Sequence, residues 1–425
     1  MRYFLLVLAL LSTLQPLSAQ QGCRTVDYKQ TAIARDPGLS QRLSEIERFT
    51  RLRLKTPSVA VTGEGGATSG TSSGTSGAGP IIIPVIVHVI YNSSAQNISD
   101  EQISSQMDVL NRDYGKLNPD TAKIPSYYRS LAADCGFRFE LAAVDTNGNH
   151  ISGIVRKHTA VQSFTYDDAI KFAAKGGDNA WDRDRYLNIW VGPLVAGTLG
   201  YSSVLGCAKE VDGVVVNYTS FGTMGTASAP FNLGRTTTHE IGHWLNLIHV
   251  WGDANCGDDE VADTPPQQAA TYGDPSGMIF SCGNTPFGNL YMDYMDFTDD
   301  VGMHLFTYGQ RDRMKILFAP GGFRAPLLNT AALVQGTTTQ APSPEGSFSG
   351  QNIRISPNPA VGLVNIVSDG ALKSGELEIY NLVGQKVVST SFNGLSLSLD
   401  VSSLPKGLYF VKLSGKNNVS RLLKM

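Results

Sequence analysis

The chain has 425 residues, which is too long for one ordinary domain and favours two or three. Hydrophobic residues make up 42% of it and the formal net charge is -3, so the composition fits soluble globular domains with sizeable cores. Because this charge provides no basic surface, we exclude a nucleic-acid partner.

The N-terminus has the features of a cleaved signal peptide. Residues 1–19 contain one positive charge, an apolar run of about ten residues and the small-residue ending LSA. No other apolar run approaches the roughly twenty residues of a transmembrane helix, so we expect no integral membrane segment in the mature chain. Export also allows the cysteines to oxidise.

Residues 20–79 are predicted to be a propeptide that ends in a flexible tether. Apolar residues recur at helical spacing over residues 39–54, which predicts an amphipathic helix. Residues 63–79 are a Gly/Ser/Thr tract that cannot form a core. Basic residues shortly before this tract make the junction easy to cleave.

Residues 80–335 are predicted to form a mixed α/β (α+β) domain. β-branched apolar runs predict strands, and capping residues followed by helical spacing predict helices. In chain order we expect a strand at 80–91, a helix at 99–114, a strand at 137–144, a helix at 165–175 and strands at 186–194 and 212–218. His88 lies in the first strand, where a packed core histidine is the favoured interpretation.

The last part of the chain, residues 350–425, follows a linker at 336–349 that is rich in Thr, Gln, Pro and Ser. Short apolar runs separated by Gly, Asn and Pro predict a small all-β sandwich. This domain contains neither His nor Cys, so we assign no catalytic chemistry to it.

The segment HEIGHWLNLIH, residues 239–249, carries three of the seven histidines. His239 and His243 share one face of a helix, so both imidazoles can reach one metal ion. His249 lies six residues beyond His243, so the helix must end and the chain must turn back to bring it to the metal. Asn246 suits this turn, because a helix commonly ends on a left-handed Gly or Asn.

Three histidine ligands leave a fourth position open, which is typical of catalytic zinc. Zinc would acidify a water molecule and polarise the scissile carbonyl, while Glu240 would take the proton and deliver it to the leaving amine. The alternative is a set of ordinary helix histidines beside a chance glutamate. The third histidine and the exported chain argue against it, and we predict a zinc-dependent endopeptidase.

Residues 80–320 resemble the pappalysin family of secreted metallopeptidases, in the metzincin clan. The similarity rests on YLNIWVGPL, LGYSS, DGVVVNYTSFGT, NLGRTTTHEIGHWLNLIHVWGD, CGDDEVADTP and YMDYMDFTDDVGMHLFTYGQ. It implies a mixed twisted sheet, an active-site helix, zinc at the floor of a cleft and a methionine beneath the ligands, here Met295. The family usually has Tyr where this chain has Phe297. This departure, with Asn246, keeps open a secreted zinc-containing binding or adhesion protein with little or no catalysis.

The resemblance also assigns roles to cysteines. In related zymogens a propeptide cysteine occupies the fourth zinc position, which here would make Cys23 a latency switch. A free or intermolecular thiol is the alternative. The family implies a disulfide between Cys256 and Cys282, and it leaves open whether Cys135 pairs with Cys207.

The segment CGDDEVADTP is rich in oxygen ligands of the kind that calcium prefers. The family binds calcium here, and Asp259 and Thr264 are the ligands that the resemblance implies. A solvated acidic loop is the alternative.

The final domain resembles the C-terminal sorting domain of proteins exported by the type IX secretion system of Bacteroidetes. The matching segments are ISPNPA, IYNLVGQKV and LPKGLYFVKL. A carbohydrate- or matrix-binding sandwich is the alternative. This resemblance implies a bacterial protein that the type IX machinery exports and that is then secreted or attached to the cell surface. Together with the pappalysin resemblance, it implies a zymogen that acts on extracellular proteins or peptides.

Overall fold

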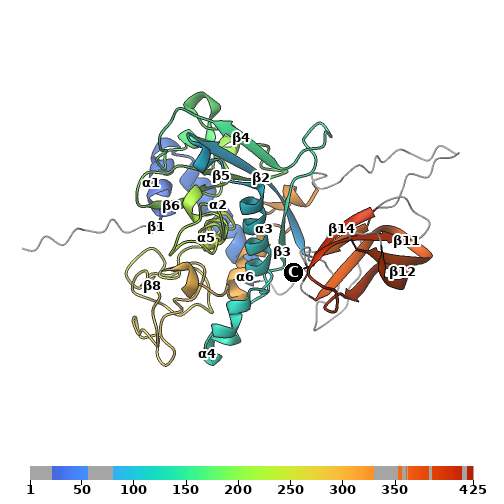
Figure 1. Ribbon diagram of the computed structural model, residues 1–425. Coiled ribbons are helices and arrows are strands. Elements are labelled where there is room, and N and C mark those ends of the chain that lie inside the picture. The colour runs from blue at the N-terminus through green and yellow to red at the C-terminus, as the bar shows by residue number, and fades with distance from the viewer. Residues whose placement is uncertain are drawn as a thin grey trace, which may run out of the picture. The chain divides into compact units, whose positions relative to one another are not determined.

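A computed structural model describes residues 22–55, 80–329, 353–356, 360, 362–381, 385–413 and 419–424 (Figure 1). The chain divides into two compact units, Met1–Thr337 and Thr338–Met425. The predicted signal peptide, the Gly/Ser/Thr tether and the linker at 336–349 lie outside the described residues.

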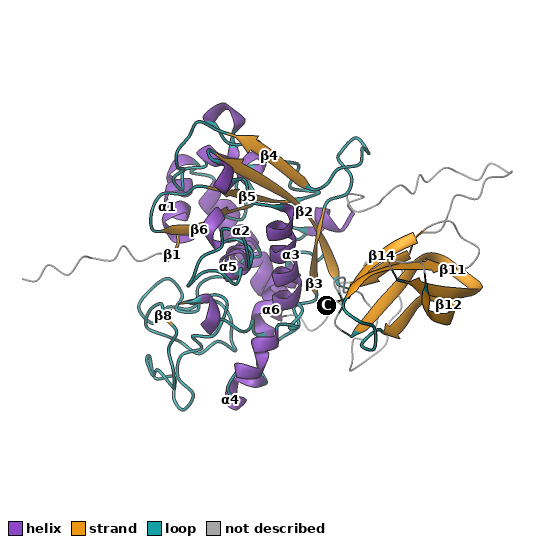
Figure 2. Ribbon diagram, in the orientation of Figure 1, coloured by secondary structure: helices purple, strands orange, loops and turns teal. Residues whose placement is uncertain are grey.

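A mixed sheet forms the frame of the first unit (Figure 2). Its strands are β1 (Gly22–Cys23), β2 (Ile81–Tyr91), β3 (Phe137–Leu141), β4 (Ile154–His158), β5 (Leu187–Gly192), β6 (Thr198–Ser202) and β7 (Val214–Asn217). Their order is β1-β6-β7-β5-β2-β3, and β4 also pairs with β2. Only the β6–β7 pairing among these strands is antiparallel. The predicted mixed fold is confirmed.

Strand β2 is the centre of this sheet. It pairs with β5 on one side and, along successive halves of its length, with β3 and β4 on the other. Helices cover both faces of the sheet at this strand. Side chains on both faces of β2 are therefore buried, which explains why its sequence is a continuous apolar run and does not alternate with polar residues. The core interpretation of His88 is confirmed, because its ring is fully buried and stacks on Trp190.

The helices of the first unit are α1 (Thr25–Arg35), α2 (Leu39–Lys55), α3 (Asp100–Tyr114), α4 (Ser126–Arg129), α5 (Arg235–Trp244) and α6 (Tyr308–Ile316). The helices predicted at 39–54 and 99–114 are confirmed as α2 and α3. Ser99 caps α3, since its hydroxyl accepts a hydrogen bond from the backbone N–H of Gln102. Within the described residues, no helix combines the length and the apolar composition that a membrane span requires.

The helix predicted at residues 165–175 is wrong. Two short 3-10 turns, Ala169–Lys171 and Ala173–Lys175, occupy the segment, and Phe172 between them is extended. Lys171 explains the departure, because its ammonium group is buried against the carboxylate of Asp168 and the rings of nearby aromatic residues. Gly177 then folds back so closely that a Cβ atom would lie 2.0 Å from the Ile170 carbonyl oxygen. Tertiary contacts override the helical pattern here.

The second unit is all-β, as predicted. Its strands are β10 (Ile353–Ser356), β11 (Leu363–Tyr380), β12 (Lys386–Asp400), β13 (Gly407–Leu413) and β14 (Val419–Lys424). They form one antiparallel sheet in the order β10-β11-β13-β14, with β12 also on β11. Alternate side chains of β11, Val364, Ile366, Leu377 and Ile379 among them, enclose a small apolar core.

Candidate active site and metal centre

Helix α5 carries the first two site histidines and is buried along its whole length. Polar contacts fix it from the side of α3. Asp113 accepts a hydrogen bond from Thr238 Oγ1 at 2.7 Å and lies 2.5 Å from Nη1 of Arg235, while Tyr114 donates to the Thr238 carbonyl. A buried helix with satisfied polar groups can hold its side chains in a fixed geometry.

The turn after α5 has the form that the sequence predicts. Asn246 has φ 75°, in the left-handed region, and the N–H of Leu247 donates to the Gly242 carbonyl at 2.9 Å. This helix end reverses the chain and brings His249 back toward the helix. The Asn246 carbonyl in turn accepts a hydrogen bond from Arg313 Nε at 2.7 Å.

Four potential ligand atoms meet at one point. The ligand atoms of Cys23, His239, His243 and His249 all lie within 4.8 Å of one another, and no second such cluster of His, Cys, Asp or Glu occurs in the described part of the chain. Nε2 of His243 is 3.1 Å from Nε2 of His239 and 3.0 Å from Nε2 of His249. Residues from the propeptide, the helix and the turn therefore converge.

The outer ring nitrogens of the three histidines are occupied. His239 Nδ1 lies 2.7 Å from the Tyr294 carbonyl, His243 Nδ1 lies 2.9 Å from the Leu247 carbonyl, and His249 Nδ1 contacts the Asp253 carboxylate. Because these oxygens accept hydrogen bonds, each Nδ1 carries the proton and each Nε2 presents a lone pair. Three lone pairs facing one another fit a divalent cation, and the outer bonds orient the rings as in known metal sites.

The electrostatics agree with neutral imidazoles. Burial lowers the pKa of His239 and of His249 to about 3, and it lowers the pKa of His243 well below its ordinary value. Metal ligation requires the neutral ring, so these histidines need lose no proton to bind a cation near neutral pH.

Glu240 lies beside the cluster and is held by the N-terminal segment. Thr25 Oγ1 donates to Glu240 Oε2 at 2.9 Å, and Cys23 Sγ lies 3.5 Å from the same oxygen. Its other oxygen, Oε1, is buried without a hydrogen-bond partner in the described residues. Burial raises the pKa of Glu240 to about 8. A buried carboxylate with a free oxygen is suited to proton transfer.

Thr25 is a site residue that the sequence reasoning missed. Its hydroxyl donates to Glu240 and accepts from the backbone N–H of Ser202 at 2.8 Å, so it joins α5 to β6. The one signal in the sequence is its position two residues after Cys23. A lone threonine carries no recognisable pattern, and only folding reveals its partners.

The segment that carries Cys23 also covers β6. Gly22 and Cys23 form β1, which pairs in parallel with Thr198 and Gly200. A Cβ atom at Gly200 would lie 2.8 Å from the Val215 carbonyl oxygen and 3.1 Å from Glu240 Oε1, so this position requires glycine for the close approach of β6 to α5. Removal of β1 would leave β6 as a sheet edge next to Glu240.

Met295 lies beneath α5. A Cβ atom at Gly242 would be only 2.4 Å from its Sδ atom, and both residues are buried. Met292 packs in a different apolar cluster, with Ile124 and Leu290. The ring of Phe297 lies beside the ligands, with its centroid 4.8 Å from that of His249.

The cysteines separate into two kinds. Cys256 and Cys282 form a disulfide, with an S–S distance of 1.97 Å. Cys135 and Cys207 are free and buried, so the second pairing left open by the sequence does not form. The reason is their placement, because the Cys207 thiol lies against Asp212 and Cys135 packs in the main apolar core.

The acidic loop after Cys256 is held together by its own oxygens. Thr264 Oγ1 lies 2.9 Å from both carboxylate oxygens of Asp259 and 2.8 Å from the Val261 carbonyl oxygen. Asp259 is buried, which raises its pKa to about 7.

Comparisons with known proteins agree with this geometry. Residues 172–319 match the family described as pregnancy-associated plasma protein-A, and residues 354–424 match the secretion system C-terminal sorting domain. An extracellular metalloprotease of Pyricularia oryzae is 32% identical over 259 residues, which cover 58% of this chain and 77% of that protein. One of Verticillium alfalfae is 31% identical over 246 residues, covering 56% and 76%.

Solved structures of a metallopeptidase are also similar to this chain. Mature mirolysin of Tannerella forsythia, in complex with a cleaved peptide, is 45% identical with a TM-score of 0.58 and covers 60% of this chain and 97% of that one. A promirolysin mutant from the same organism is 40% identical with a TM-score of 0.61 and covers 72% and 95%.

The fold and the histidine cluster thus define a metallopeptidase whose active site is covered by the N-terminal segment. The chain belongs to the pappalysin family of metallopeptidases. It is a zinc-dependent endopeptidase made as a latent zymogen, and its sorting domain makes it a type IX secretion substrate of the Bacteroidetes kind. The alternative of a binding or adhesion protein without catalysis is not favoured, because these relatives are metalloproteases.

Proposed function

We propose that His239, His243 and His249 hold the zinc ion and that Glu240 is the general base of peptide hydrolysis. The observation that carries this proposal is the set of three Nε2 lone pairs that face one point beside the Glu240 carboxylate. Bound zinc would supply a Lewis acid for the scissile carbonyl and an acidified water. Glu240 would accept a proton from that water and deliver it to the leaving amine.

The remaining residues position these groups. Met295 supports α5 from below, and the carbonyls and carboxylate behind the histidines hold the rings in place. Once β1 has left, β6 offers its backbone N–H and C=O groups to an extended segment of a protein or peptide substrate.

Latency would then rest on two neighbouring propeptide side chains. Cys23 brings its thiol to the fourth side of the cluster, and Thr25 occupies the oxygen of Glu240 that its hydroxyl contacts. The parallel pairing of β1 fills the edge of β6 at the same time. Ligand, base and substrate edge would all be blocked by one short segment.

We also propose a calcium ion at the acidic loop, bound by Asp259 and Thr264 with the neighbouring Val261 carbonyl. Carboxylate, hydroxyl and carbonyl oxygens meet there within 2.9 Å of the Thr264 hydroxyl. Calcium should raise the thermal midpoint of the wild type and leave that of Asp259→Asn unchanged. An equal shift in both proteins would contradict this site.

The central test is peptide cleavage after limited proteolysis of the full chain near the Gly/Ser/Thr tether. Cleavage should appear on activation and fall about 10²–10⁴-fold in Glu240→Ala. A zinc chelator should abolish it, and added zinc should restore it. Bound zinc with no cleavage across a diverse peptide library would instead support the binding-protein alternative, and Phe297→Tyr would then be the first substitution to make.

A further inference from the structure

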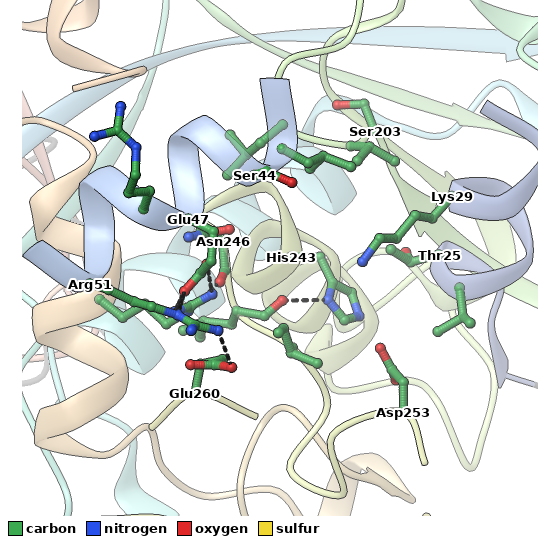
Figure 3. Close-up of a pocket in the computed structure, with 18 of the residues that line it drawn as sticks. Thr25, Lys29, Ser44, Glu47, Arg51, Ser203, His243, Asn246, Asp253 and Glu260 are labelled. Atoms are coloured by element: carbon green, nitrogen blue, oxygen red, sulfur yellow. Dashed lines mark hydrogen bonds and ion pairs between the residues drawn. The ribbon is translucent and has the colours of Figure 1, made fainter. Parts of the chain in front are cut away.

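A cavity of about 610 Å³ lies between propeptide helix α2 and the turn that follows α5. Figure 3 shows Arg51 and Glu260 toward one end of it and His243 with Asp253 toward the other. Helix α2 forms one wall of this space and the turn around Asn246 forms another. Departure of the propeptide would therefore open a groove that leads to a site histidine.

Arg313, on α6, is the most deeply buried cation of this cavity. Its side chain is 1% exposed, and its Nε donates to the Asn246 carbonyl at 2.7 Å. Its other two nitrogens face the propeptide, where Nη1 and Nη2 donate to the two carboxylate oxygens of Glu47 at 3.1 and 2.6 Å. One edge of the guanidinium is thus fixed by the catalytic domain and the other by the propeptide.

Arg313 is linked to the site histidine His243 through the turn that follows α5. It holds the carbonyl of Asn246, and the carbonyl of the next residue, Leu247, lies 2.9 Å from Nδ1 of His243. The cation and the ring of a site histidine are therefore attached to adjacent peptide groups of one turn. A peptide that reaches the histidines along the groove passes this guanidinium.

Activation removes the partner of Arg313. Glu47 precedes the tether, so it leaves with the propeptide, and the two nitrogens that it accepts from lose their acceptor. A buried charge without a partner is costly, and a guanidinium fork matches a carboxylate in two parallel hydrogen bonds. The neighbouring Arg51–Glu260 pair is a weaker feature because both of its side chains reach solvent.

We propose that Arg313 of the mature enzyme binds an acidic side chain of the peptide substrate, at one fixed number of residues from the scissile bond. Glu47 of the propeptide occupies this subsite in the zymogen and shows the chemistry that it accepts. The inference rests on the proposed peptidase function and adds a substrate preference to it.

The test uses mature enzyme prepared from the full chain by limited proteolysis. One cleavable peptide is made in a series that moves a single Glu through the positions on both sides of the scissile bond, each with a matched Gln peptide. At one position the Glu peptide should have a kcat/KM about tenfold higher, the effect of one charge-assisted contact. At the other positions the ratio should be close to one.

Two variants of helix α6 test whether Arg313 causes the preference for the Glu peptide. Arg313→Gln should bring the Glu-to-Gln ratio close to one, whereas Arg311→Gln, which changes a more exposed arginine paired with Asp312, should keep the wild-type ratio. The ratio separates recognition from structure, because a merely structural loss at Arg313 would slow both peptides equally. If Arg313→Gln does not fold, Arg313→Lys is the substitute. Lys keeps the charge but cannot form two parallel hydrogen bonds, so the Glu-to-Gln ratio should fall below the wild-type value and stay above one.

A ratio of one at every position in the wild type would overturn the proposal. An unchanged ratio in Arg313→Gln, or an undiminished one in Arg313→Lys, would overturn it as well. In each of these cases both peptides are still cleaved, so the proposed function stands. Failure to cleave either peptide would contradict the proposed function and this inference together.

Discussion

The two ends of the propeptide make different contacts with the catalytic domain. At the near end, Cys23 and Thr25 touch the site itself, through the histidine cluster and Glu240. At the far end, Glu47 on α2 binds Arg313 without contacting Glu240 or the site histidines in any described hydrogen bond or ion pair. If the near end inhibits the site, as proposed, and the far end retains the propeptide, the two effects depend on separate residues, and substitutions should separate them.

The largest effect is expected at the near end, in the zymogen that carries Cys23→Ala. A thiolate bound to zinc contributes more than one charge-assisted hydrogen bond, so activity of the uncut zymogen should rise more than about a hundredfold. Peptide cleavage by the intact chain measures it. Cys135→Ala, a free and buried cysteine elsewhere in the domain, is the matched control and should leave latency intact.

Thr25→Val should have the next largest effect. It removes the hydrogen bond to Glu240 while keeping the shape of the side chain, so activity of the uncut zymogen should rise about tenfold. Thr31→Val on α1 is the control, because the Thr31 hydroxyl contacts only an exposed backbone carbonyl among the described residues. Equal activity of the two variants would mean that Thr25 has no part in latency.

At the far end, Glu47→Gln should weaken retention without relieving inhibition. Gln keeps one oxygen acceptor for the buried Arg313 and removes only the charge, so the substitution should cost about 1 kcal/mol and the cut propeptide should dissociate about fivefold faster. The delay between cleavage of the tether and the onset of activity measures this. Glu45→Gln, on the same helix, is the control. A rise in the activity of the uncut zymogen would break the separation of the two ends.

Asn246 lies in the turn between the site histidines and its carbonyl binds Arg313. Substitutions at Asn246 should change the stability of the zymogen and should have the smallest effect of those considered. Its φ of 75° costs alanine about 1 kcal/mol, so Asn246→Ala should lower the thermal midpoint by a few degrees, while Asn246→Gly should leave it nearly unchanged. Thermal unfolding of the zymogen is the measurement. A greater loss in Asn246→Gly than in Asn246→Ala would show that the asparagine side chain matters more than its backbone conformation.

Patterns that are local in the sequence predicted the fold well. Helices α2 and α3 and strands β2, β5 and β7 follow from apolar spacing and capping within one segment. The segment at 165–175 has a similar spacing but no α-helix, because the Lys171 ammonium is buried against the rings of Tyr28 and Tyr201, which lie in distant parts of the chain. Short-range patterns fail where a buried charge sets the backbone.

The sequence by itself determined the histidine set, the glutamate beside it and the left-handed turn at Asn246. His239 and His243 have the spacing of one helix face, and Asn246 suits the turn that returns His249. Only the tertiary structure brought Thr25 to Glu240 and Glu47 to Arg313, pairs that are 215 and 266 residues apart. No periodicity relates residues at such separations. Their contacts arise because the propeptide packs on a domain that is folded from the rest of the chain.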